Sequence, residues 1–154
     1  METIQVSSSA FDQGANIPVK YTCDAQNVSP PLRWSGTPQG TQSIALIADD
    51  PDAPRGTFTH WIAFNIDASR SELPEGTGQT AGGPAGTLGE NSFGNLGYGG
   101  PCPPRGSSHR YFFKLYALDS QLDLEQGANK AKVEQAMQGH ILGQGQLMGK
   151  YTRK

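Results

Sequence analysis

Residues Ser43–Ala48 have the sequence SIALIA, in which apolar side chains are almost continuous. A short run without alternation predicts a β-strand that is buried on both faces. His60–Ile66 (HWIAFNI) has the same character, and in Arg110–Leu118 (RYFFKLYAL) both faces are rich in aromatic or aliphatic side chains. Apolar and polar side chains alternate in Ile17–Tyr21, which predicts a half-buried strand. Together these runs predict a core built from strands.

The composition supports the same conclusion. The chain has 154 residues, with 20 glycines, 11 prolines and only 35% hydrophobic residues, which argues against a helical bundle or a coiled coil. The length predicts one domain, residues 1–154. More than half of the glycines lie in Leu73–Ser108. A segment this long inside a compact domain predicts an ordered functional loop.

One helix is expected near the C-terminal end. Asn129 is a plausible N-cap, and Val133, Met137 and Ile141 recur every four residues. Gly143 is a reasonable place for this helix to stop. The residues alone therefore predict an all-β domain with a single C-terminal helix.

Charge and apolar runs exclude some classes of function. With 12 basic and 14 acidic residues the net charge is −2, so binding of nucleic acid by bulk charge is not expected. No apolar run is long enough to span a bilayer, and Met1–Val6 has no signal-peptide character, so a cytoplasmic protein without membrane insertion is expected. Cys23 and Cys102 form no zinc pattern. They are two buried thiols or one long-range disulfide, and a cytosolic location favours thiols.

Polar side chains are found at the ends of the predicted strands. Asp50 follows the first buried strand, His60 opens the second, and His109 opens the aromatic strand with Tyr111 two residues further on the same face. If these strands are neighbours in a sheet, the side chains meet at one rim. Each residue alone has a structural explanation, as a turn, a hydrogen-bonded histidine or a core tyrosine. Only their joint occurrence indicates a site.

Two other chemistries were weighed. Asp50, His60 and either Ser107 or Ser108 form a conceivable hydrolytic triad, but the serines lack the strained turn of a nucleophile. A metal site from His60, His109 and Cys102 has irregular spacing. We therefore expect no enzyme, no metal and no cofactor.

Two blocks of sequence are more specific than these single residues. They are Asp50–Pro54 (DPDAP) followed by Thr59–Trp61 (THW), and Gly100–Pro104 (GPCPP) followed by His109–Tyr111 (HRY). On these blocks the chain resembles the phosphatidylethanolamine-binding protein family, in its short bacterial and archaeal branch of Raf kinase inhibitor-like proteins. Supporting similarity extends over nearly the whole chain.

The resemblance implies a β-sandwich of two packed antiparallel sheets with few helices, and one small anion-binding pocket at a sheet end. Carried over by motif, the ligand-binding residues are Asp50, His60, Gly100, Pro101, His109 and Tyr111. Asp52 and Pro54 would shape the pocket, with a cis Ala53–Pro54 bond. The loops that Cys23 and Cys102 flank would lie near this pocket, so these two residues form a possible disulfide. Homodimers are implied by the bacterial relatives.

The expected function is non-enzymatic binding of a small anionic or phosphorylated ligand. Asp50 would accept imidazole N–H groups, fix their tautomer and favour their charged form, so that both histidines present donors to the anion. Backbone amides of the turn before His109 and the Tyr111 hydroxyl would complete the site. The alternative is a protease or kinase inhibitor that binds its partner through the pocket-side surface, with Leu73–Ser108 as the exposed loop.

Overall fold

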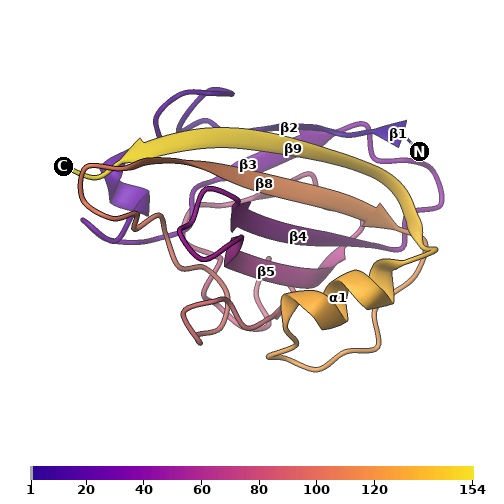
Figure 1. Cartoon of the computed structure of the whole chain (residues 1–154). Helices are drawn as coiled ribbons and strands as arrows, with labels where there is room; N and C mark the ends of the chain where they lie inside the picture. Colours follow the sequence, from indigo (N-terminus) through magenta and orange to yellow (C-terminus); the bar gives the residue numbers. More distant parts are fainter. Residues whose placement is uncertain (1) are drawn as a thin grey trace.

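The structure is a computed structural model that describes residues 2–154, and it contains two β-sheets and one α-helix (Figure 1). The larger sheet has the strand order β1-β9-β8-β4-β5-β7, and the smaller sheet has the order β2-β3-β6. The strands are β1 (Glu2–Thr3), β2 (Gln5–Ser7), β3 (Leu32–Ser35), β4 (Ser43–Asp50), β5 (Phe58–Asp67), β6 (Glu72–Leu73), β7 (Thr87–Leu88), β8 (Ser108–Leu118) and β9 (Ile141–Thr152). A 3₁₀ helix spans Val19–Tyr21, and α1 spans Lys130–Met137. The predicted fold class is confirmed, and all strand pairings are antiparallel except that of β1 with β9.

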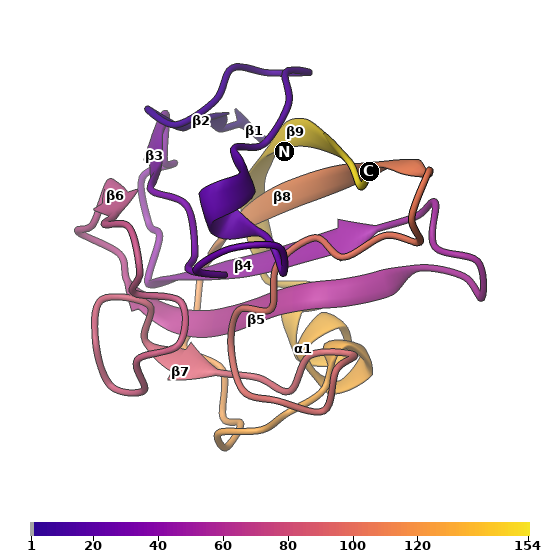
Figure 2. The same ribbon diagram turned by 90° about the vertical axis from the view of Figure 1, so that its left-hand side faces the viewer.

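The central strand β4 shows why the larger sheet is buried on both sides over part of its width. All eight residues of β4 are buried. Ile44 and Leu46 belong to the core between the two sheets, whereas Ala45 and Ile47 pack in a second cluster that includes Val133 of α1. Figure 2 shows the smaller sheet and α1 on opposite sides of the larger sheet. The continuous apolar run therefore reflects a strand covered on both faces.

Two local predictions are wrong. Val19–Tyr21 is a 3₁₀ helix with an exposed Val19, not part of a half-buried strand, because Tyr21 and Thr22 donate their backbone amides back to Pro18 and Val19. The helix after Asn129 has the predicted N-cap, whose side-chain oxygen accepts a hydrogen bond from the Lys132 amide at 2.9 Å. It ends at Met137, however, and Ile141 already belongs to β9.

The predicted helix overlaps the first residues of β9, which is the longest strand within residues 2–154. This strand carries glycine at 143, 145 and 149, on the face toward the N-terminal segment. A Cβ at Gly145 would lie 1.8 Å from the Ile4 carbonyl oxygen, and one at Gly149 would lie 2.6 Å from the Ile17 side chain. Gly143 and Gly145 are therefore required for the close approach of the backbone near Glu2 and Ile4, and Gly149 leaves room for the side chains of Ile17 and Phe11.

Gly145→Ala is expected to destabilise the protein by about 1–3 kcal/mol, because the new methyl group must displace the segment around Ile4. Urea unfolding measures the loss, and amide exchange at Ile4, which donates to the Gln144 carbonyl at 2.9 Å, locates it. Gln146→Ala is the control, because the side chain of this neighbouring residue leaves the opposite face of the strand. Unchanged stability and unchanged protection of Ile4 in Gly145→Ala would contradict the argument.

Candidate functional site

A β-bulge in β5 places His60 beside the end of β4. Ala48 pairs with Trp61 and Asp49 pairs with Thr59, so β5 has one extra residue, His60, at this point. Bulges of this kind commonly redirect a side chain beside a functional site. Here Trp61 remains in the core between the sheets, while His60 lines a pocket together with Asp50.

The pocket has a volume of about 310 Å³ and lies at the end of the larger sheet. Among the residues predicted from the sequence, it is lined by Asp50, Pro54, His60, His109 and Tyr111. Gly100, Pro101 and Asp52 do not line it. Sequence reasoning missed Phe58, Phe93, Cys102 and Arg153 as lining residues. Cys102 had a signal, because it lies inside the GPCPP block, but Arg153 had none.

Asp50 holds one histidine rather than two. The Nδ1–H of His109 donates to Asp50 Oδ2 at 2.7 Å, and both side chains are buried. The other carboxylate oxygen accepts the Asp52 amide at 2.8 Å. The Nδ1–H of His60 instead donates to the Gly99 carbonyl oxygen at 2.8 Å. The expectation that Asp50 orients both imidazoles is therefore wrong for His60.

Burial is the main influence on the pKa values of His60 and Tyr111, two of the residues that line the pocket. Burial lowers the pKa of His60 below its ordinary value of 6.5, while the Gly99 hydrogen bond and the charge of Asp50 oppose this shift. Burial also raises the pKa of Tyr111, and the charge of Asp50 adds to this effect. Among residues 2–154, the buried Tyr111 hydroxyl has no hydrogen-bond partner. At neutral pH the pocket thus contains a largely uncharged His60 and a protonated, unpaired phenol.

Aromatic rings form much of the wall. The ring centroid of His60 lies 4.9 Å from that of Phe58, 5.6 Å from Phe93 and 5.2 Å from Tyr111. Phe58 and Phe93 contact each other edge-on at 4.7 Å. An apolar wall of this kind limits water around the polar groups and strengthens their interactions with a ligand.

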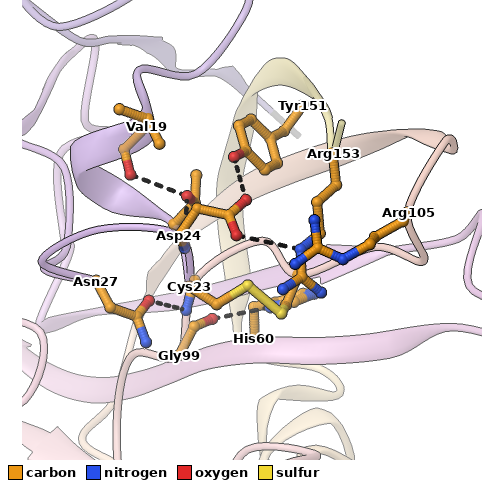
Figure 3. The surroundings of a disulfide bond; sticks show 12 residues. Val19, Cys23, Asp24, Asn27, His60, Gly99, Arg105, Tyr151 and Arg153 are labelled. Atoms are coloured by element: carbon orange, nitrogen blue, oxygen red, sulfur yellow. Dashed lines mark hydrogen bonds and ion pairs between the residues drawn. A yellow bond between two sulfur atoms is a disulfide. The ribbon is translucent and has the colours of Figure 1, made fainter.

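A disulfide between Cys23 and Cys102 anchors the loop that contributes Cys102, Pro103 and Pro104 to the pocket lining (Figure 3). The Cys23 amide donates to the Pro101 carbonyl at 3.1 Å, and the Asn27 side chain accepts from the Gly100 amide at 2.8 Å. A Cβ at Gly100 would lie 2.2 Å from the Tyr21 carbonyl oxygen. The Gly100–Pro101 turn therefore packs against residues 21–27 and does not line the pocket.

Cys23 and Cys102 form a disulfide, which is one of the two alternatives left open by the sequence, because the fold brings their Cα atoms within 5.4 Å. The preference for thiols rested on a cytosolic location, and the disulfide weakens the argument for that location, since most cytosol keeps thiols reduced. The expectation of a cis Ala53–Pro54 bond is wrong, because this bond is trans, as are all peptide bonds within residues 2–154.

The residues weighed for a hydrolytic triad and for a metal site are not arranged for either chemistry. Asp50 contacts His109, not His60, and neither Ser107 nor Ser108 lines the pocket. The Cys102 sulfur is held in the disulfide, so it supplies no thiolate for a metal. Within the described part of the chain, no group of three His, Cys, Asp or Glu residues is arranged to hold a metal ion, and no helix has the length and apolar character to cross a membrane.

Comparison with known proteins gives one consistent result. The sequence model of the family described as phosphatidylethanolamine-binding protein matches residues 7–152. A UPF0098 protein of Methanothermobacter thermautotrophicus is 50% identical over 97% of this chain and 99% of its own length, and one of Aquifex aeolicus is 47% identical over 97% and 89%. The crystal structure of a putative phosphatidylethanolamine-binding protein homologue from Chlamydia trachomatis matches with a TM-score of 0.90 and 40% identity, covering 100% of both chains. That of E. coli YbcL, a new member of the mammalian family, matches with a TM-score of 0.91 and 32% identity, covering 98% of this chain and 99% of YbcL. The chain therefore belongs to the phosphatidylethanolamine-binding protein family.

Proposed function

We propose that this protein is a non-enzymatic binding protein whose histidine pocket holds the phosphate, phosphoryl or carboxylate group of a small ligand. One observation carries the proposal. His60 and His109 line the same pocket, and each Nδ1–H is already bonded to a fixed acceptor, the Gly99 carbonyl or Asp50. Each ring therefore keeps only Nε2 for a ligand, and a protonated Nε2 is a donor. Arg153, also in the lining, supplies a permanent positive charge.

The rest of the lining indicates the other part of the ligand. Phe58 and Phe93 are apolar, and Pro54, Pro103 and Pro104 have no backbone N–H to donate. A volume of about 310 Å³ is at the lower end for small-molecule sites. The ligand that fits best is a compact anion attached to a small apolar group. The family description names a phosphate-bearing lipid, which favours a phosphoryl group over a carboxylate.

Isothermal titration with benzenesulfonate between pH 5.5 and 8.5 tests the proposal, because the charge of this probe does not change over that range. Burial lowers the pKa of His60, so its imidazole is neutral at the upper end. An anion stabilises the imidazolium, and binding therefore takes up a proton. The affinity should rise as the pH falls below about 6.5, by about tenfold over the series. An affinity that does not change with pH would remove the proposed role of the histidines.

Histidine variants provide matched controls for this titration. His60→Gln and His109→Gln should each reduce both the affinity and its pH dependence. His140→Gln should change neither, because His140 is exposed and bonded to Asp119 away from the pocket. Equal effects of all three substitutions would indicate a general charge effect and not a site.

A second candidate function rests on two exposed side chains. Phe93 and Leu96 are among the few large exposed hydrophobic residues of the described chain, and both lie in the predicted loop Leu73–Ser108. A protease or kinase inhibitor would use such a surface next to the pocket. Inhibition of a purified protease or kinase that is lost in Phe93→Ser and Leu96→Ser would support this function. Inhibition unaffected by both variants would exclude this surface.

A further inference from the structure

Strand β4 ends in two carboxylates that face opposite sides of the larger sheet. Asp50 faces the histidine pocket, whereas Asp49 lies on the other face, with a side chain that is only 2% exposed. The Nζ atoms of Lys114 and Lys130 each lie 3.2 Å from Asp49 Oδ2. A second hollow of about 310 Å³ is located here, and Arg110 also lines it. The same sheet thus carries an ionic site on each face.

Within the described chain, the charged residues that line this hollow are three cations, Arg110, Lys114 and Lys130, and one anion, Asp49, although the whole chain has a net charge of −2. Lys114 and Lys130 share the single carboxylate of Asp49, so one ammonium charge is not compensated. Arg110 and Lys150 are directly opposite each other in the pairing of β8 with β9. Like charges in such a pair are destabilising, and a bound anion would relieve the repulsion.

The guanidinium of Arg110 makes a bidentate ion pair with Asp52. It donates to both oxygens of Asp52 at 2.9 Å, and these bonds lower the pKa of Asp52 to about 2. Its central carbon lies 5.5 Å above the ring of Phe112. Lys114 and Lys130 are tethered by Asp49 but remain 34% and 27% exposed. The cations are therefore held by ion pairs while their side chains remain partly exposed beside the hollow, which lowers the entropy lost on binding.

We infer that this outer hollow is a second anion site, which takes a small ligand carrying a tetrahedral oxyanion such as a phosphate monoester. Lys114 and Lys130 would contact the oxyanion, and Gln146, which also lines the hollow, would add a neutral hydrogen bond. The site is separate from the histidine pocket and does not depend on the function proposed for it. No histidine among residues 2–154 lines this hollow, so its affinity should not follow the pH dependence expected for the histidine pocket.

Titration with sulfate at pH 8, followed by amide chemical shifts, tests the site under conditions in which His60 of the other pocket is neutral. The expected shifts are at Lys114, Lys130 and Gln146. Lys114→Gln and Lys130→Gln should each weaken binding by about three- to tenfold. Lys132→Gln is the matched control, because Lys132 is exposed on the same helix but does not line the hollow. Absence of these shifts, or an equal loss in Lys132→Gln, would overturn the inference.

Asp49→Asn gives a result that a purely structural role would not. Asp49 competes with the ligand for both ammonium groups, so its neutralisation should tighten sulfate binding by at least about threefold. Unchanged or weaker binding in a folded Asp49→Asn protein would overturn the inference. Lys130→Gln leaves Lys114 on Asp49 and remains a valid test whatever the stability of the aspartate variant. Comparison of inorganic phosphate with glycerol phosphate then distinguishes a site for the free anion from one for an ester.

Discussion

The Cys23→Ala/Cys102→Ala double variant is expected to lose about 3–4.5 kcal/mol of stability, the largest effect of any substitution considered for this chain. The two residues are 79 positions apart, and loop-closure entropy for a ring of this length corresponds to about 4.5 kcal/mol. The variant should still fold, because a chain of 154 residues buries a substantial core without cross-links. Urea unfolding of the wild type with and without reductant, beside the double variant, measures the difference.

The same variant should also affect ligand binding. Cys102 lines the histidine pocket, and the loop that it anchors includes Gly99, whose carbonyl fixes the ring of His60. Loss of the disulfide frees this loop, so benzenesulfonate should bind more weakly at pH 5.5. Reductant must not change the double variant further, which controls for effects of the reductant itself. A stability loss below about 1 kcal/mol would show that packing alone holds the loop.

The strands that could be predicted from sequence are those whose partners lie on both faces. In β4, β5 and β8 the apolar runs are long enough that no other element competes with a buried strand. β9 could not be predicted in this way, because its glycines match no strand propensity. They are explained by contacts with the N-terminal segment, such as that of Gly145 with the backbone of Ile4, which is 141 positions away in the sequence and approaches it in the fold.

The sequence predicted several residues of the site but not the hydrogen bonds between them. Asp50, His60, His109 and Tyr111 do line one pocket, but the sequence did not show which acceptor each histidine uses. That choice depends on the bulge at His60, which directs its ring toward the Gly99 carbonyl and leaves Asp50 to His109. Arg153 was missed for a similar reason: it directly follows β9 and is held beside the pocket by its contact with Asp24 at 3.1 Å.

Asp50→Asn should weaken benzenesulfonate binding at pH 5.5 by about tenfold, although it removes a negative charge from an anion pocket. The reason is the buried contact of Asp50 with His109 at 2.7 Å. A carboxylate that accepts an imidazole N–H favours the charged ring, and an amide does so far less. The lost carboxylate also removes a buried charged partner, so we expect a stability loss of about 1–3 kcal/mol. Titration calorimetry and urea unfolding measure the two effects.

Asp67→Asn is the control for this substitution, since it removes the same charge at the end of β5 and this residue lines neither the histidine pocket nor the outer hollow. If bulk charge governed the pocket, both variants would bind benzenesulfonate more tightly and by similar amounts. If Asp50 acts through His109, only Asp50→Asn weakens binding, and the Asp67 variant stays at the wild-type affinity. Tighter binding in Asp50→Asn would mean that repulsion between the carboxylate and the ligand outweighs the support that Asp50 gives to His109, and the proposed mechanism would then be wrong.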